Sequence, residues 1–102
     1  MYSFIEDVPA NADLYAKVRA GLGPETPQGL VVHLAIETEG GLRYVDVWER
    51  EQDWTAFRDG RLNPVLRDVL SSHGINVDTA EVTRESVNVI DAWLAAEPAH
   101  AG

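Results

Sequence analysis

Two strand-like runs separated by a pair of glycines constrain this chain more than any other feature of its sequence. Residues 29–38 and 42–50 are rich in Val, Ile and Leu, with Gly40 and Gly41 between them. Because glycine adopts positive φ without strain, the pair favours a tight turn. The two runs are therefore predicted to form a β-hairpin.

The hydrophobic pattern of the hairpin favours a register that pairs Leu34 with Val47 and Ile36 with Val45. In that register one face is entirely aliphatic and carries Val32, Leu34, Ile36, Val45 and Val47. The opposite face is mixed and carries Val31, His33, Ala35, Glu37, Tyr44, Asp46, Trp48 and Arg50. We expect helices to cover the aliphatic face and the mixed face to remain open.

The segments around the hairpin complete an alternating pattern. Residues 2–8 and about 79–93 alternate as strands, and apolar residues recur at helical spacing from Asn11 to Leu22 and from Glu51 to Gly74, with a break expected at Asn63. The order strand, helix, strand, strand, helix, strand predicts an α+β, ferredoxin-like βαββαβ fold with a four-stranded antiparallel sheet. Residues 1–94 are predicted to form this single domain, with 95–102 as a frayed C-terminal tail.

The mixed sheet face is too apolar to be left in water. It includes Val31, Ala35, Tyr44 and Trp48, more apolar surface than a monomer of this size usually exposes. An isologous contact between two copies would cover it. A homodimer through the open sheet face is therefore predicted.

Residues 29–66 resemble the dimeric α+β barrel group that includes the antibiotic-biosynthesis-type monooxygenases. The most specific part is the stretch VDVWERE, followed at once by a helix that carries Trp54 and Phe57. The resemblance implies a homodimer whose sheets close into a barrel and whose cleft binds a flat hydrophobic molecule. It also implies that some members oxidise polycyclic phenols without metal or flavin.

A related branch of that group binds haem through a histidine on the second helix. Here Leu66 stands at the corresponding place, and His73 follows seven residues later, near the end of the helix. The haem-binding pattern is therefore not matched, and no cofactor is predicted.

The candidate site has a catalytic part and a binding part. His33 with Asp46 could act as a general base near neutral pH, although a histidine in a strand is more often a hydrogen-bonded packing residue. Six residues are predicted to bind a ligand, although the same side chains could simply fill the core: Tyr15, Tyr44, Trp48, Trp54, Phe57 and Leu66.

The charge of the chain excludes several partners. Seventeen acidic and eight basic residues give a net charge of −9, the wrong sign for binding nucleic acid or an anionic membrane. No apolar run approaches the length of a membrane span. The absence of cysteine makes the cytoplasm the expected compartment.

The histidines also argue against a metal site. His33, His73 and His100 do not have the spacing of metal ligands, so no metal is predicted. Two functions remain open. One is a protein that binds a small aromatic molecule and oxidises it as a cofactor-independent monooxygenase. The other is a non-catalytic structural or partner-binding protein of the same fold.

Overall fold

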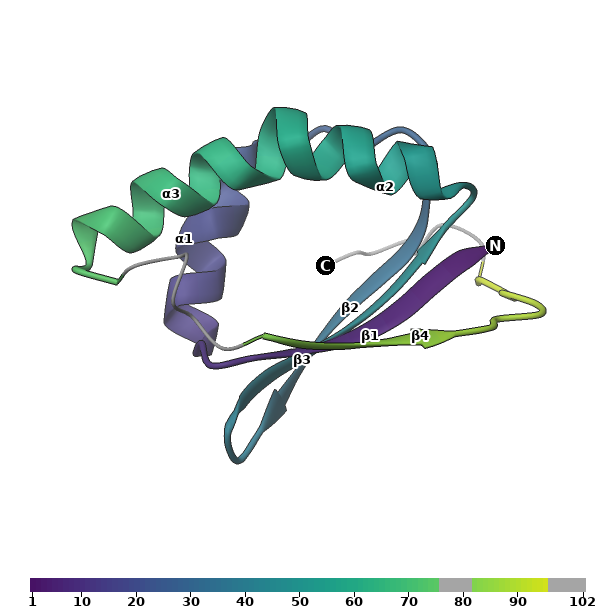
Figure 1. The fold of residues 1–102 in the computed structure, drawn as a ribbon, viewed down its shortest axis with the longest axis horizontal. Helices are drawn as coiled ribbons and strands as arrows, with labels where there is room; N and C mark the ends of the chain where they lie inside the picture. Colours follow the sequence, from purple (N-terminus) through teal and green to yellow (C-terminus); the bar gives the residue numbers. More distant parts are fainter. Residues whose placement is uncertain (76–81, 96–102) are drawn as a thin grey trace.

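The computed structural model describes residues 1–75 and 82–95, and its elements follow the predicted order. The sheet has the strand order β2-β3-β1-β4, all neighbours are antiparallel, and the helices lie on one side of it (Figure 1). The elements are β1 (Tyr2–Val8), α1 (Ala12–Leu22), β2 (Leu30–Thr38), β3 (Gly41–Trp48), α2 (Glu51–Phe57), η1 (Arg58–Leu62), α3 (Asn63–Ser72) and β4 (Thr83–Val87). The predicted α+β fold class is confirmed.

The first two elements form where local sequence signals place them. The alternating β1 ends just before Pro9, which cannot donate a backbone hydrogen bond. At the start of α1 the side chain of Asn11 accepts a 2.8 Å hydrogen bond from the Leu14 N–H. Gly23 ends the helix with a φ of +83°.

The hairpin forms, but its predicted register is wrong. Leu34 pairs with Val45 and Ile36 with Arg43, so the two-residue turn is Glu39-Gly40. Gly41 instead begins β3 at a φ of +151°, where a Cβ would lie 2.2 Å from the Val8 carbonyl oxygen. This glycine is therefore required by the close approach of β1. Side chains along a strand alternate between the two faces, and the pairing shifts by two residues. The residues predicted to share a sheet face therefore still do so.

The helices cover the mixed face of the sheet, whereas they were predicted to cover the aliphatic face. Trp48, expected on the open face, is 1% exposed and packs against Trp54 and Phe57. Leu34 and Ile36, expected beneath the helices, are 49% and 43% exposed. The helix-covered side, called the inner face below, carries Phe4, His33, Tyr44, Asp46 and Trp48; the outer face carries Ile5, Leu34, Ile36, Val45 and Val47.

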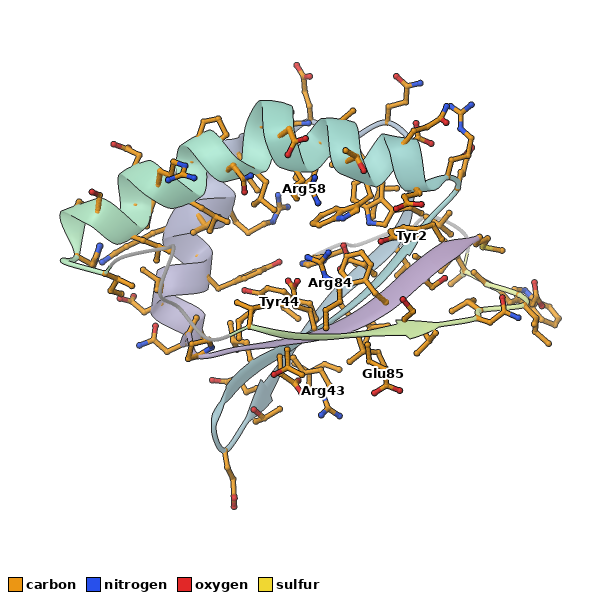
Figure 2. All side chains as sticks on the ribbon, viewed as in Figure 1. Tyr2, Arg43, Tyr44, Arg58, Arg84 and Glu85 are labelled. Atoms are coloured by element: carbon orange, nitrogen blue, oxygen red, sulfur yellow. The ribbon has the colours of Figure 1, made fainter. Side chains whose placement is uncertain are left out.

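Side-chain directions show the same division. In Figure 2 Tyr2, Tyr44 and Arg84 project from the sheet toward the helices, whereas Arg43 and Glu85 project away from them. The physical reason lies in the core, an aromatic cluster of Phe4, Trp48 and Trp54. Its ring centroids are 4.9 Å apart for Phe4–Trp54 and 5.6 Å for Trp48–Trp54. Such large rings bury more area than valine or leucine and span the space between helix and sheet.

The predicted break at Asn63 is a π-helical turn within a continuous helical segment. Asn63 keeps helical dihedrals, φ −59° and ψ −43°, and its N–H donates to the Arg58 carbonyl oxygen five residues earlier. Pro64 follows at the start of α3, and because it has no N–H it cannot bond a carbonyl oxygen of the preceding turn, where the π-helical spacing occurs. The chain thus passes over the sheet as one helical arm, α2-η1-α3.

The last strand is shorter than predicted. β4 ends at Val87, and beyond it Ile90 and Trp93 are 89% and 94% exposed. The alternation of residues 87–93 therefore does not produce a buried strand face. Residues 79–81 of the predicted strand, and all of the predicted tail except Ala95, lie outside the described residues.

Candidate functional site

A cavity of about 420 Å³ lies between the inner sheet face and the helices. Of the two alternatives that the sequence left open, side chains that line a space rather than fill it, the structure has the first. All eight residues singled out from the sequence line it: Tyr15, His33, Tyr44, Asp46, Trp48, Trp54, Phe57 and Leu66. The volume is within the range typical of small-molecule sites. The structure brings these residues together, while their roles remain predictions.

One end of the cavity carries a continuous chain of side-chain hydrogen bonds. The Tyr15 hydroxyl lies 2.8 Å from Nε2 of His33, and Nδ1 of His33 lies 2.6 Å from Oδ1 of Asp46. The Trp48 indole Nε1–H donates to Oδ2 of Asp46 over 3.0 Å. Three elements supply the chain, because Tyr15 comes from α1, His33 from β2, and the other two residues from β3.

The carboxylate of Asp46 fixes the direction of these bonds. Its side chain is 7% exposed, and an ionised carboxylate only accepts hydrogen bonds. Nδ1 of His33 must therefore carry a proton, and in the neutral imidazole Nε2 is then the acceptor that faces the Tyr15 hydroxyl. The arrangement orients one histidine lone pair toward α1 and the cavity.

The observed register is what joins His33 to Asp46. They are direct cross-strand partners. In the predicted register, which paired Leu34 with Val47, His33 would instead lie opposite Trp48. Trp48 instead donates a hydrogen bond to Asp46 from its indole N–H. Its side chain is buried within its own chain. The expected place of Trp48 on an open face that a second copy covers is therefore wrong.

Two tyrosines at this end stay protonated near neutral pH. Burial raises the pKa of Tyr44 to about 12, and it also raises the pKa of Tyr15. Their ring centroids are 5.6 Å apart, and the Tyr44 ring is 5.4 Å from that of His33. The Tyr44 hydroxyl can therefore donate a hydrogen bond to a ligand, whereas the Tyr15 hydroxyl, which donates to His33, can accept one from a ligand. Neither tyrosine is ionised at neutral pH.

Beside Tyr44 the inner face carries an ion pair that the sequence prediction missed, because Glu6 is the cross-strand partner of Tyr44. Arg84 of β4 donates from Nε to a Glu6 carboxylate oxygen over 2.9 Å. Its guanidinium carbon lies 4.7 Å from the Phe4 ring centroid and 5.3 Å from that of Trp54. Glu6 lines the cavity and is 9% exposed. The one sequence signal for Glu6 was its position two residues after Phe4 in β1, which places both side chains on the same sheet face.

Arg19 is a second omission. It lines the cavity and lies one helical turn after Tyr15 on α1. Its i, i+4 spacing from a singled-out residue could have identified it, but an arginine on an amphipathic helix is normally assigned to solvent.

The described part of the chain has neither a metal-ligand cluster nor a membrane-spanning helix. Across residues 1–75 and 82–95, no three His, Asp or Glu side chains group as metal ligands would. Within the same ranges, every helix is too short or too polar to span a bilayer. His73, the histidine near the end of the second predicted helix, is exposed, and its Nε2 lies 3.1 Å from Nζ of Lys17.

Family models and curated proteins give no match, whereas solved structures with the same fold are found. A putative antibiotic biosynthesis monooxygenase from Nitrosomonas europaea matches with a TM-score of 0.61 at 11% identity, over 89% of this chain and 100% of that one. A second from Deinococcus radiodurans gives 0.55 at 16%, over 93% and 100%.

A third structure, the NE2512 protein of unknown function from Nitrosomonas europaea, gives a TM-score of 0.59 at 15% identity, over 94% of both chains. At such identities the likeness concerns the fold. It agrees with the resemblance seen in residues 29–66. The chain therefore has the βαββαβ fold of antibiotic-biosynthesis-monooxygenase-like structures.

Proposed function

We propose that this protein binds a small hydroxylated aromatic molecule in its cavity and oxidises it with dioxygen, as a cofactor-independent monooxygenase. The observation that carries the proposal is the hydrogen-bonded chain Tyr15–His33–Asp46 at one end of an otherwise aromatic cavity. An aromatic wall suits a flat apolar ligand, and the polar end suits its hydroxyl group.

The proposed first step is removal of a proton from the ligand. Nε2 of His33 is the acceptor in the neutral imidazole, and Asp46 stabilises the imidazolium that forms. Since the Tyr15 hydroxyl occupies this nitrogen, it would pass its proton to His33 while accepting one from the ligand. A neutral tyrosine can do so without ever becoming a free phenolate.

The later steps need only the ligand and dioxygen. For a hydroxyanthrone, the anion gives one electron to dioxygen, and the two radicals join through a C–O bond. His33 returns its proton to yield a hydroperoxide. Loss of the remaining C–H proton and cleavage of the O–O bond release water and leave a carbonyl group. Each substrate thus consumes one dioxygen and releases one water.

The test uses dithranol, a three-ring hydroxyanthrone, with oxygen consumption measured above the uncatalysed rate. His33→Gln and Tyr15→Phe should each lower the enzymatic rate at least about 100-fold, which is typical for loss of general acid–base catalysis. Quenching of tryptophan fluorescence should show that both variants still bind dithranol. His73→Gln, which changes an exposed histidine, is the matched control and should retain the full rate.

A non-catalytic protein is the alternative function. It is favoured by the fact that each His33 nitrogen and both Asp46 oxygens already have partners, as in a purely structural network. Binding of dithranol without oxygen uptake would favour a carrier of aromatic molecules. Absence of both would favour a structural or partner-binding protein.

We also propose a homodimer through the open sheet face. In the structure this is the outer face, whereas the sequence analysis expected the face that carries Trp48 to be open. Leu34 and Ile36 are about half exposed there and adjoin Val45 and Ile5 through the strand pairing. A contiguous aliphatic patch of this kind is costly to leave in water. A second copy can cover it with the same surface.

A further inference from the structure

The basic side chains of this acidic protein are nearly all engaged by partners within the chain. Arg43 bonds Asp7, Arg50 bonds Asp53, Arg58 bonds Asp59, Arg61 bonds the Leu22 and Glu25 carbonyl oxygens, Arg84 bonds Glu6 and Lys17 pairs with Asp13. Arg67 also has a partner. With seventeen acidic residues available, such pairing is expected.

Arg19 departs from this pattern. Within residues 1–75 and 82–95 its guanidinium makes no hydrogen bond or ion pair with another side chain. It is nevertheless a lining residue of the cavity and is exposed, which places it where the cavity meets solvent. A guanidinium has five N–H donors and strongly favours a planar carboxylate as its partner.

The position of Arg19 relates it directly to the polar end of the cavity. Tyr15 and Arg19 are four residues apart on α1, so they lie on the same helical face, about 6 Å apart along its axis. The positive charge of Arg19 acts on the Tyr15 hydroxyl, where it opposes the effect of burial on the pKa. The two groups therefore share one part of the cavity wall.

We propose that the ligand is an aromatic acid that carries a hydroxyl group, with its carboxylate bound by Arg19 and its hydroxyl bonded to Tyr15. The proposal rests on the binding half of the function proposed above and narrows its ligand class. The separation of the two side chains favours a hydroxyl and a carboxylate on one edge of the ring system. The aromatic residues of the cavity hold the apolar remainder, and about 420 Å³ is enough space for two or three fused rings.

The test compares three ligands of one scaffold by isothermal titration calorimetry. They are a naphthol with a carboxylate meta to its hydroxyl, the same naphthol without the carboxylate, and the corresponding naphthoate without the hydroxyl. Wild-type protein should bind the hydroxynaphthoate at least about tenfold more tightly than either partial ligand, since each charged or polar contact adds to the affinity.

Variants assign the difference to Arg19. Arg19→Gln should reduce the affinity for the hydroxynaphthoate about tenfold and leave that for the naphthol within twofold. Arg19→Lys should recover part of the loss. Lys17→Gln, with the same change of charge on the same helix but outside the cavity lining, is the matched control and should behave as wild type.

The outcomes separate this inference from the proposed function. Equal binding of hydroxynaphthoate and naphthol, or equal losses in Arg19→Gln and Lys17→Gln, would overturn the role of Arg19 while the cavity remains a binding site. Failure of all three compounds to bind while dithranol still binds would overturn this inference alone, and failure of dithranol as well would overturn both proposals.

Discussion

The two faces of the sheet differ in a way that the hydrophobicity of their residues does not suggest. The outer face is the more aliphatic, yet Leu34 and Ile36 on it are 49% and 43% exposed. The inner face carries a histidine, an aspartate and a tyrosine, yet it contains Trp48, which is 1% exposed. The helices therefore cover the face whose aromatic rings reach them and whose polar groups can bond one another.

This difference shows how a small domain can combine a core with a binding site. Phe4, Trp48 and Trp54 meet at one end of the inner face and anchor the helical arm. Next to this cluster, where Trp48 donates to Asp46, the side chains of Tyr15, His33 and Asp46 satisfy each other by hydrogen bonds and leave the cavity open. Buried polar groups are tolerated there because they have partners.

The largest expected effect tests whether the inner face holds the fold together. Trp48→Ala should lower the free energy of unfolding by about 3–5 kcal/mol, because it removes a fully buried indole and leaves a cavity. Urea unfolding followed by circular dichroism measures this loss. Trp93→Ala is the matched control, since Trp93 is 94% exposed and its removal should change little. Similar losses in both variants would contradict the proposed division of the faces.

The next effect tests whether the outer face is covered by a second copy. Ile36→Lys should raise the dimer dissociation constant about 100-fold, or about 2.7 kcal/mol, because it places a like charge from each copy in an apolar contact. Sedimentation velocity across a concentration series measures the shift, and circular dichroism should be unchanged.

Ile90→Lys is the control for that experiment. Ile90 is 89% exposed but lies beyond β4, outside the sheet. A shift with Ile90→Lys and none with Ile36→Lys would place the contact at the C-terminal segment and refute the proposed use of the outer face.

The smallest effect concerns the response of the inner face to alkali. The pKa of Tyr44 rises from 10.0 to about 12 on folding, so between these values the folded chain holds a proton that the unfolded chain has lost. The free energy of unfolding should therefore fall as the pH rises through this window. Tyr44 is only partly buried, so the fall should not exceed about 2 kcal/mol.

Urea unfolding at several pH values between about 9 and 12 measures this dependence. Tyr44→Phe should flatten the curve, while the raised pKa of Tyr15 leaves a smaller slope of the same sign. An unchanged slope in the variant would show that the Tyr44 hydroxyl is freely solvated.

Much of the fold was predictable from the sequence because its signals are local. The Asn11 cap, Pro9 and the alternation of residues 2–8 act within a few residues, and the structure places β1 and α1 accordingly. The grouping of side chains into two sheet faces was also predictable, since it depends on a period of two. The aromatic spacing of Trp54 and Phe57 identified α2.

Other features depend on contacts between distant segments. The hairpin register depends on the approach of Val8 to Gly41, and the π-helical turn at residues 58–62 replaces the expected break at Asn63. The roles of Glu6 and Arg19 depend on where β4 and α1 pack. No local pattern contains these distances.

The sequence by itself determined which residues share a sheet face and the order of the elements, and it singled out eight of the residues that line the cavity. Only the tertiary structure decided which face the helices cover, that the space beneath them is open, and that His33 lies between Tyr15 and Asp46. The physical reason is that periodicity fixes relative side-chain direction along one segment. The choice between two faces depends on packing area and hydrogen bonds summed over segments far apart in the chain.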